Sequence, residues 1–168
     1  MTTPLPDPQV TETPTRHPTI CLALSTPLLS TLRRILPPKP HFTLSIGSGT
    51  GLLEALLVQH DPSATIAVEG VEVDSAVNRY IPEQDMHVVP GAWATSGRAL
   101  AAAAWLFVYP REVGLVGEVF GFGNGFGVDW PDYEGVFAKS LFSALTFLGE
   151  TEGLAPYEVG VVARRSVS

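Results

Sequence analysis

The chain has 168 residues, about the length of one domain, and 45% of them are hydrophobic, which is enough for a packed core. Its formal net charge of −7 argues against a nucleic-acid partner, because phosphate contacts need a basic face. The single cysteine, Cys21, excludes an internal disulfide framework, and no apolar run reaches the ~18 to 20 residues of a membrane span, so we expect a cytoplasmic protein with no membrane partner.

Residues 1–18 predict a flexible arm, because they are rich in threonine and in proline, which blocks helix and removes backbone donors. They show no clear cleavage site, so we do not interpret them as a signal peptide. The remainder, 19–168, is then expected to form a single domain.

An amphipathic helix is predicted next. Thr26 is predicted as the N-cap and Pro27 as the first helical residue, and Pro37 ends the pattern. The apolar face of this helix suits packing on a sheet, and it suits the contact surface of a homodimer equally well. That face consists of Leu28, Leu29, Leu32, Ile35 and Leu36.

The most informative stretch is 42–57, which reads FTLSIGSGTGLLEALL. An apolar run at 42–46 predicts a buried strand, and the leucines after Gly51 have helical spacing. A glycine turn between strand and helix can present backbone N–H groups and the positive end of the helix to a ligand. Glycines in the turn allow positive φ and close approach of that ligand.

The ligand class can be narrowed. A dinucleotide-binding turn requires a small residue at the position where this chain has Leu52. A phosphate-binding loop requires a lysine at the start of the helix, and this chain has none there. What remains, G-x-G-x-G after an apolar strand, resembles the first motif of class I S-adenosylmethionine-dependent methyltransferases, which often reads much like IGSGTGLL. The alternative is a strand-to-helix turn that binds nothing.

The resemblance implies an α/β fold: a doubly wound, seven-stranded, mostly parallel sheet with helices on both faces and an antiparallel last strand. It implies S-adenosylmethionine as the cofactor, held by Gly47, Ser48, Gly49 and Gly51. Ser45 is a departure, since the family usually has an acid there that hydrogen-bonds water or the methionine ammonium. A hydroxyl can make that hydrogen bond but supplies no charge.

A second strand is predicted at 64–73. An acid at its end can accept hydrogen bonds from both ribose hydroxyls, and Glu72 lies 21 positions beyond Gly51, close to the roughly 20-residue spacing of dinucleotide folds. We therefore favour Glu72, with Val73 beside it. Glu69 and Asp74 are rivals, but alternation puts Glu69 on the other sheet face and Asp74 is placed to cap a helix at 75–80.

A third strand is predicted at 86–89. The resemblance implies that the residues after it hold the adenine, here Ala92 and Trp93, with Trp93 stacking on the base. Trp93 is equally interpretable as a core aromatic. His87, within the strand, is more often a satisfied buried histidine than a base.

The resemblance also implies where the methyl group faces: the end of a fourth strand, predicted at 105–109 after a helix at 95–103. Tyr109 there could orient a substrate, and Arg111 could bind a carboxylate or lie on the surface. His17 is a further catalytic candidate, because in many small methyltransferases the segment before the first strand folds over the ligand. No metal-ligating cluster of acids is present at this position in the sequence.

Towards the C-terminus, 121–127 is glycine-rich and predicts a flexible loop around a fifth strand. A helix is predicted at 132–143. Two strands at 145–148 and 157–163 then resemble the closing hairpin of the methyltransferase fold.

The expected function is methyl transfer to a small molecule by in-line displacement, in which the enzyme mainly brings the two reactants together. A catalytically inactive methyltransferase-like partner subunit is the alternative, motivated by Ser45 and by the absence of an acid for the adenine amine. A nicotinamide-dependent enzyme is disfavoured by the bulk of Leu52.

Overall fold

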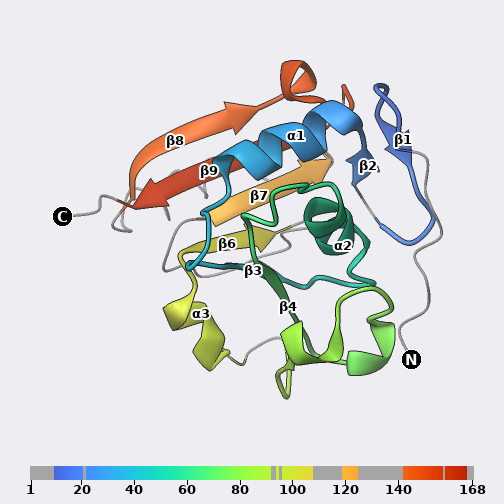
Figure 1. Cartoon of the computed structure of the whole chain (residues 1–168). Helices are drawn as coiled ribbons and strands as arrows, with labels where there is room; N and C mark the ends of the chain where they lie inside the picture. Colours follow the sequence, from blue (N-terminus) through green and yellow to red (C-terminus); the bar gives the residue numbers. More distant parts are fainter. Residues whose placement is uncertain are drawn as a thin grey trace.

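The computed structural model describes residues 10–20, 22–91, 94, 96–107, 119–124, 142–156 and 158–165. In this part of the chain, one sheet runs through the molecule with the strand order β5-β4-β3-β6-β7-β9-β8, and α1 and α2 lie in front of it (Figure 1). The expected α/β class with a parallel central sheet is therefore confirmed. The number of strands in the whole chain stays a prediction.

The central strands all run in the same direction. β3 (Thr43–Ile46) pairs in parallel with β4 (Val68–Glu72) and with β6 (Ala104–Phe107), which lie on either side of it. The chain thus moves from β3 to β4 and β5 in one direction and then returns to build the other half from β6. In open α/β sheets, ligands bind beyond the carboxyl ends of the strands at such a reversal. The outer parallel strands are β5 (Met86–Val88) and β7 (Val119–Asn124).

The last strand of the described residues is antiparallel to its neighbours, as predicted. β9 (Glu158–Arg165) lies between β7 and β8 (Phe142–Leu148) and pairs antiparallel with both. Two predictions in this half are wrong. The glycine-rich residues 121–124 belong to β7 rather than to a loop, because their backbone pairs with β9, and with β6 at residue 121. Residues 142–143, predicted as the end of a helix, open β8.

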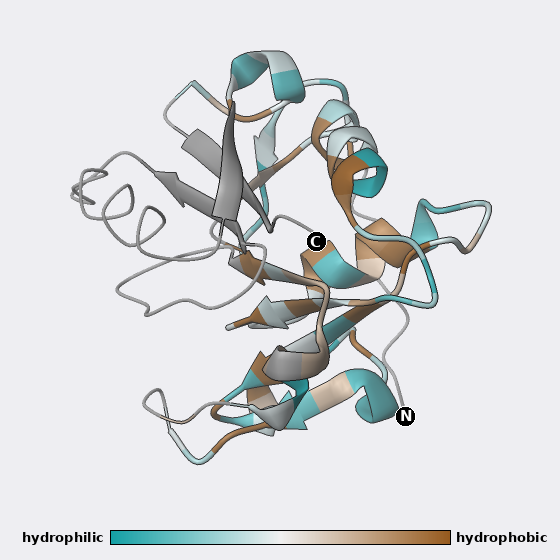
Figure 2. Cartoon of the chain, turned by 90° about the vertical axis from the view of Figure 1, so that its left-hand side faces the viewer, coloured by the Kyte–Doolittle hydropathy of each residue, from teal (hydrophilic) through white to brown (hydrophobic). Residues whose placement is uncertain are grey.

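Two helices cover one face of the sheet. α1 (Thr26–Ile35) buries Leu28, Leu29 and Leu32, and α2 (Leu52–Gln59) buries leucines against the same core. The N-cap of α1 is Ser25 rather than the predicted Thr26, because the Ser25 hydroxyl accepts from Leu28 N and donates to the Gly153 carbonyl. Figure 2 shows α2 and the central strands as largely hydrophobic. The apolar face of α1 is thus used within one chain.

The other face carries α3 (Gly97–Ala101). The Trp105 indole on β6 donates to the Ala99 carbonyl at 2.8 Å, and Arg98 reaches Glu69 on β4. Since Trp105 alternates with the buried Leu106 along β6, the two residues serve opposite faces of the sheet. Helices therefore lie on both faces within the described residues.

Short elements complete the architecture. β1 (Thr15–Arg16) pairs with β2 (Ala23–Leu24), so this described part of the predicted arm has local structure. The arm's boundary at residue 18 stays a prediction, and residues 1–9 lie outside the description. The 3-10 turns among the described residues are η1 (Ser75–Val77), η2 (Glu83–Asp85) and η3 (Glu150–Glu152).

Two predicted elements are shorter than expected. β4 begins at Val68 rather than at residue 64, because Asp61 accepts from Ile66 N in a preceding turn and Ala64 has a φ of 48°. The helix predicted at 75–80 is only η1, because the Asn78 side chain bonds both the N–H and the carbonyl of Ile81 and closes a turn there.

Candidate functional site

The site is centred on the turn from β3 into α2. Gly47, Gly49 and Gly51 all have positive φ, at 69°, 59° and 78°. A methyl group added at Gly47 or Gly49 would meet no atom of the described residues within 4 Å, whereas one added at Gly51 would lie 2.5 Å from Ile81 Cγ1. Gly51 is therefore required by packing. Gly47 and Gly49 leave open space where a ligand can approach the backbone.

The N–H groups of this turn differ from the expectation of amides free for a ligand. Those of Gly47 and Ser48 donate to the Val71 carbonyl, and that of Gly51 donates to the Ser48 carbonyl. The Gly49 N–H donates to the side-chain carboxylate of Glu72. The cause is the tightness of the turn against β4, which brings internal acceptors within reach. The turn therefore offers a ligand open space, whereas these backbone N–H donors are already used within the chain.

Glu72 is aimed at the turn from the carboxyl end of β4. Its Oε1 accepts from Gly49 N at 2.6 Å, and its Oε2 accepts from Val73 N at 3.3 Å. Gly70 makes this approach possible, because a Cβ there would lie 2.7 Å from Ser48 Oγ and 2.5 Å from Ile81 Cδ1. The predicted ribose acceptor and the predicted glycine turn are therefore in direct contact.

The two rival acids are used elsewhere, as predicted. Glu69 points to the opposite sheet face, where it bonds His87 Nε2 at 2.7 Å and Arg98 Nε at 2.9 Å. Asp74 Oδ1 accepts from Ala76 N at 2.9 Å and caps η1. His87 is thus a histidine satisfied by a neighbouring acid.

Ser45 meets an acid that the sequence analysis did not single out. Its fully buried hydroxyl donates to Glu54 Oε1 at 2.5 Å, and Glu54 is only 2% exposed. Burial raises the pKa of Glu54 to about 7, against the opposing hydrogen bond from Ser45. Glu72 adds to the rise in the pKa of Glu54 through like-charge repulsion. The acid that the family usually has at the position of Ser45 is thus present on α2, but burial disfavours its ionised form.

Two exposed valines lie beside Glu72. Val73, a predicted cofactor residue, is 50% exposed, and Val88 at the end of β5 is 55% exposed. Val88 is the register partner of Glu72, so their side chains project from the same sheet face. Exposed apolar side chains beside a hydrogen-bonding acid suit a flat nucleobase attached to a ribose. Val88 carried no sequence signal, since apolar residues are ordinary in a strand.

The segment before α1 reaches the turn from the other side. Thr50 Oγ1 donates to the Thr19 carbonyl at 3.2 Å. The ring of His17, the catalytic candidate in this segment, bonds Thr19 Oγ1 through Nδ1 at 2.9 Å. His17 is thus tied to its own segment, two residues from the contact with the turn.

Four predicted site residues lie outside the described residues and stay predictions: Ala92, Trp93, Tyr109 and Arg111. Within the description, no group of three or more His, Cys, Asp or Glu side chains is placed to ligate a metal. Among the helices in the same part of the chain, none has the length and hydropathy that a bilayer crossing needs.

No protein-family model matches the chain, and no curated protein sequence matches it. Three solved structures each match over 83% of the chain. The CurJ carbon methyltransferase has a TM-score of 0.51 and 12% sequence identity, and the methyltransferase domain of bacterial CtHen1-C has a TM-score of 0.53 and 14% sequence identity. The citrinin polyketide synthase CMeT domain has a TM-score of 0.52 and 10% sequence identity. The chain spans 52% and 51% of the first and last of these and 95% of the CtHen1-C domain.

At these identities the shared feature is the fold. The chain has a class I S-adenosylmethionine-dependent methyltransferase-like fold, as the glycine motif predicts.

Proposed function

We propose that this protein is an S-adenosylmethionine-dependent methyltransferase that acts on a small molecule. The whole of 19–168 would form one domain with the seven-stranded sheet of that class. The observation that carries the proposal is the contact between Glu72 and Gly49 across an open glycine turn. A ribose lying on the turn would exchange its two hydroxyls for the Gly49 N–H as donors to this carboxylate.

The charges around the turn support an adenosyl sulfonium over a dinucleotide. A helix N-terminus ordinarily favours phosphate. Here Glu72 occupies the Gly49 N–H, and the buried Glu54 lies in the first turn of α2. A pyrophosphate on the turn would be repelled by the Glu72 carboxylate and would make ionisation of Glu54 still more costly. A cationic ligand would be attracted by Glu72 and would favour the ionised form of Glu54.

The chemistry proposed is an in-line displacement at the methyl carbon, in which the bond from sulfur to the methyl breaks as the substrate nucleophile bonds to it. Rate enhancement then comes mainly from holding the two reactants together. In this chain, Glu72 would fix the ribose, Val73 and Val88 would contact the base, and the open positions at Gly47 and Gly49 would admit the methionine portion. Tyr109 and Arg111 remain the candidates for contacting the substrate.

Isothermal titration with S-adenosylmethionine tests the proposal. We expect the wild type to bind and Glu72→Ala to bind roughly tenfold more weakly or worse, because the ribose hydroxyls lose a charged acceptor. Glu150→Ala is the matched control, since this exposed acid of η3 follows β8 at the far edge of the sheet. Absence of binding at millimolar cofactor, or equal affinities for wild type and Glu72→Ala, would refute the proposal.

A further inference from the structure

Glu54 is a buried acid that the fold leaves half-satisfied. Its side chain is 2% exposed, its Oε1 accepts from the Ser45 hydroxyl at 2.5 Å, and its Oε2 has no hydrogen-bond partner among the residues that the structure describes. An ionised carboxylate in such a place is costly unless it is paired with a cation. The group must therefore hold a proton or await a positive charge.

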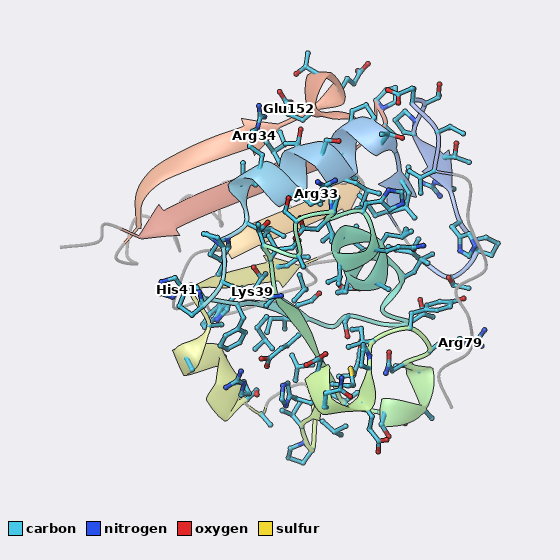
Figure 3. The ribbon with its side chains drawn as sticks, viewed as in Figure 1. Arg33, Arg34, Lys39, His41, Arg79 and Glu152 are labelled. Carbon is cyan, nitrogen blue, oxygen red and sulfur yellow. The ribbon has the colours of Figure 1, made fainter. Side chains whose placement is uncertain are left out.

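Within the described part of the chain, the charged groups of the neighbouring elements do not supply that positive charge. On β4 the group that acts on Glu54 is Glu72, which has the same sign. α1 carries Arg33 and Arg34, labelled in Figure 3, and neither is among the groups that shift the pKa of Glu54; Arg34 acts on Glu152 instead. Arg79 donates its backbone N–H to the Thr50 carbonyl, while its side chain extends away from the molecule (Figure 3).

The fold keeps Glu54 in this position by two features of its surroundings. Ser45, on β3 just before the turn, fixes one carboxylate oxygen, and the leucines of α2 exclude water from the helix face. The free oxygen, Oε2, lies in the first turn of the helix that starts at the glycine turn. A ligand that carries a positive charge to this turn would complete the environment of the acid.

We infer that Glu54 is the charge partner of a cationic group on the ligand of the glycine turn, and that it makes the site select cationic adenosine derivatives over neutral ones. This inference rests on the proposed function. S-adenosylmethionine carries both a sulfonium and an ammonium group, so it has the required chemistry. On binding, the O–H bond of the neutral acid breaks, the proton leaves to solvent, and the ligand's cation takes its place.

The test compares two ligands that share the adenosine part. S-adenosylmethionine is cationic, whereas 5′-methylthioadenosine is neutral and lacks the amino-acid portion. Glu54→Gln keeps the size of the side chain and an acceptor for Ser45. We expect this variant to bind S-adenosylmethionine roughly 10- to 100-fold more weakly and to bind methylthioadenosine within about twofold of the wild type. Glu69→Gln, the same change on the opposite sheet face, is the control and should alter neither affinity.

A second readout separates a charge from a merely structural role. Titrations near pH 6.5 in two buffers of different ionisation enthalpy give the number of protons released on binding. With a pKa of about 7, Glu54 is mostly protonated in the free protein, so the wild type should release about half a proton or more, and Glu54→Gln close to none. The double variant Ser45→Asp/Glu54→Ser places the acid on β3 instead of α2. We expect it to regain the preference for the cationic ligand that Glu54→Gln loses.

The outcomes distinguish the two claims. If the wild type binds neither adenosine compound, the proposed function itself fails. If it binds both, and Glu54→Gln weakens both equally or weakens neither, the inference about Glu54 is wrong while the proposed function stands. Thermal unfolding of each variant shows whether it is folded, and the double variant supplies the test should Glu54→Gln not fold.

Discussion

Glu69 and Glu54 lie on opposite faces of the same sheet, and the fold compensates the burial of these two carboxyl groups in different ways. Glu69 accepts from His87 and twice from Arg98, and the guanidinium of Arg98 lies 4.2 Å from the centre of the Phe42 ring. Burial acts to raise the pKa of Glu69, but the hydrogen bonds from Arg98 and His87 outweigh it and lower the pKa. Glu54 accepts from the Ser45 hydroxyl and has no ion pair among the described residues, and burial raises its pKa.

The difference separates an acid that serves the fold from one that is left for a ligand. Glu69 joins β4, β5 and α3 through charges that the chain itself provides. Glu54 is more deeply buried than Glu69 and has no charged partner of opposite sign among the described residues, so ionising it destabilises the folded protein. Such a residue persists in a fold when the cost is offset in another state, which here we propose to be the ligand complex.

The largest expected effect is a pH dependence of stability from Glu54. Its folded pKa of about 7 lies above the ordinary carboxyl pKa of 4.5, so the folded state holds an extra proton between these two pH values. The free energy of unfolding therefore falls as pH rises through this window, by roughly 2 to 3 kcal/mol between pH 5 and pH 8. Urea unfolding should show this loss in the wild type and not in Glu54→Gln. Identical pH profiles for the two proteins would contradict the assignment.

Ser45→Ala should have a smaller effect. The change removes the donor to Glu54 Oε1 and leaves a buried acceptor unsatisfied, at a cost of about 1 to 2 kcal/mol. Ser48→Ala is the control, because the Ser48 hydroxyl is half-buried and donates only to Met86 Sδ at 3.8 Å. Chemical denaturation measures both. Equal stabilities of the two variants would show that the Ser45 contact contributes little.

Glu69→Gln should have the smallest effect and the opposite pH sign. Because the pKa of Glu69 is lowered in the folded state, its contribution is present above the ordinary carboxyl pKa of 4.5 and is lost as pH falls below it. The contribution is small because solvent reaches the Arg98 side chain, which is 43% exposed, and screens the pair. Unfolding at pH 7 and pH 3, with and without added salt, checks this. A loss that persists at pH 3 or in high salt would contradict an ionic role.

Sequence reasoning found the parts of this site that depend on local pattern. The strand, the glycine turn and the helix start at Leu52 follow from spacing, and the placement of Glu69 away from Glu72 follows from alternation along one strand. The cap role of Asp74 was readable for the same reason. These features are fixed within a few residues of chain.

The parts that sequence reasoning missed depend on how elements dock. Glu54 lies in a helix with leucines on several sides, so the pattern does not say that this acid faces Ser45. The internal use of the Gly47 and Gly49 amides depends on acceptors from β4. Residues 121–124 form a strand because they pair with β9, which lies more than 30 residues further along the chain. Each outcome requires the three-dimensional neighbour, not the sequence around the residue.

The most direct test of the account is a crystal structure of the protein with S-adenosylhomocysteine, the product that remains after methyl transfer. We predict the ribose hydroxyls on the Glu72 carboxylate, with the amino-acid portion over Gly47 and Gly49 and its ammonium on the side of Glu54. A ligand bound elsewhere, or a Glu72 that keeps the Gly49 N–H and does not touch the ligand, would contradict the account.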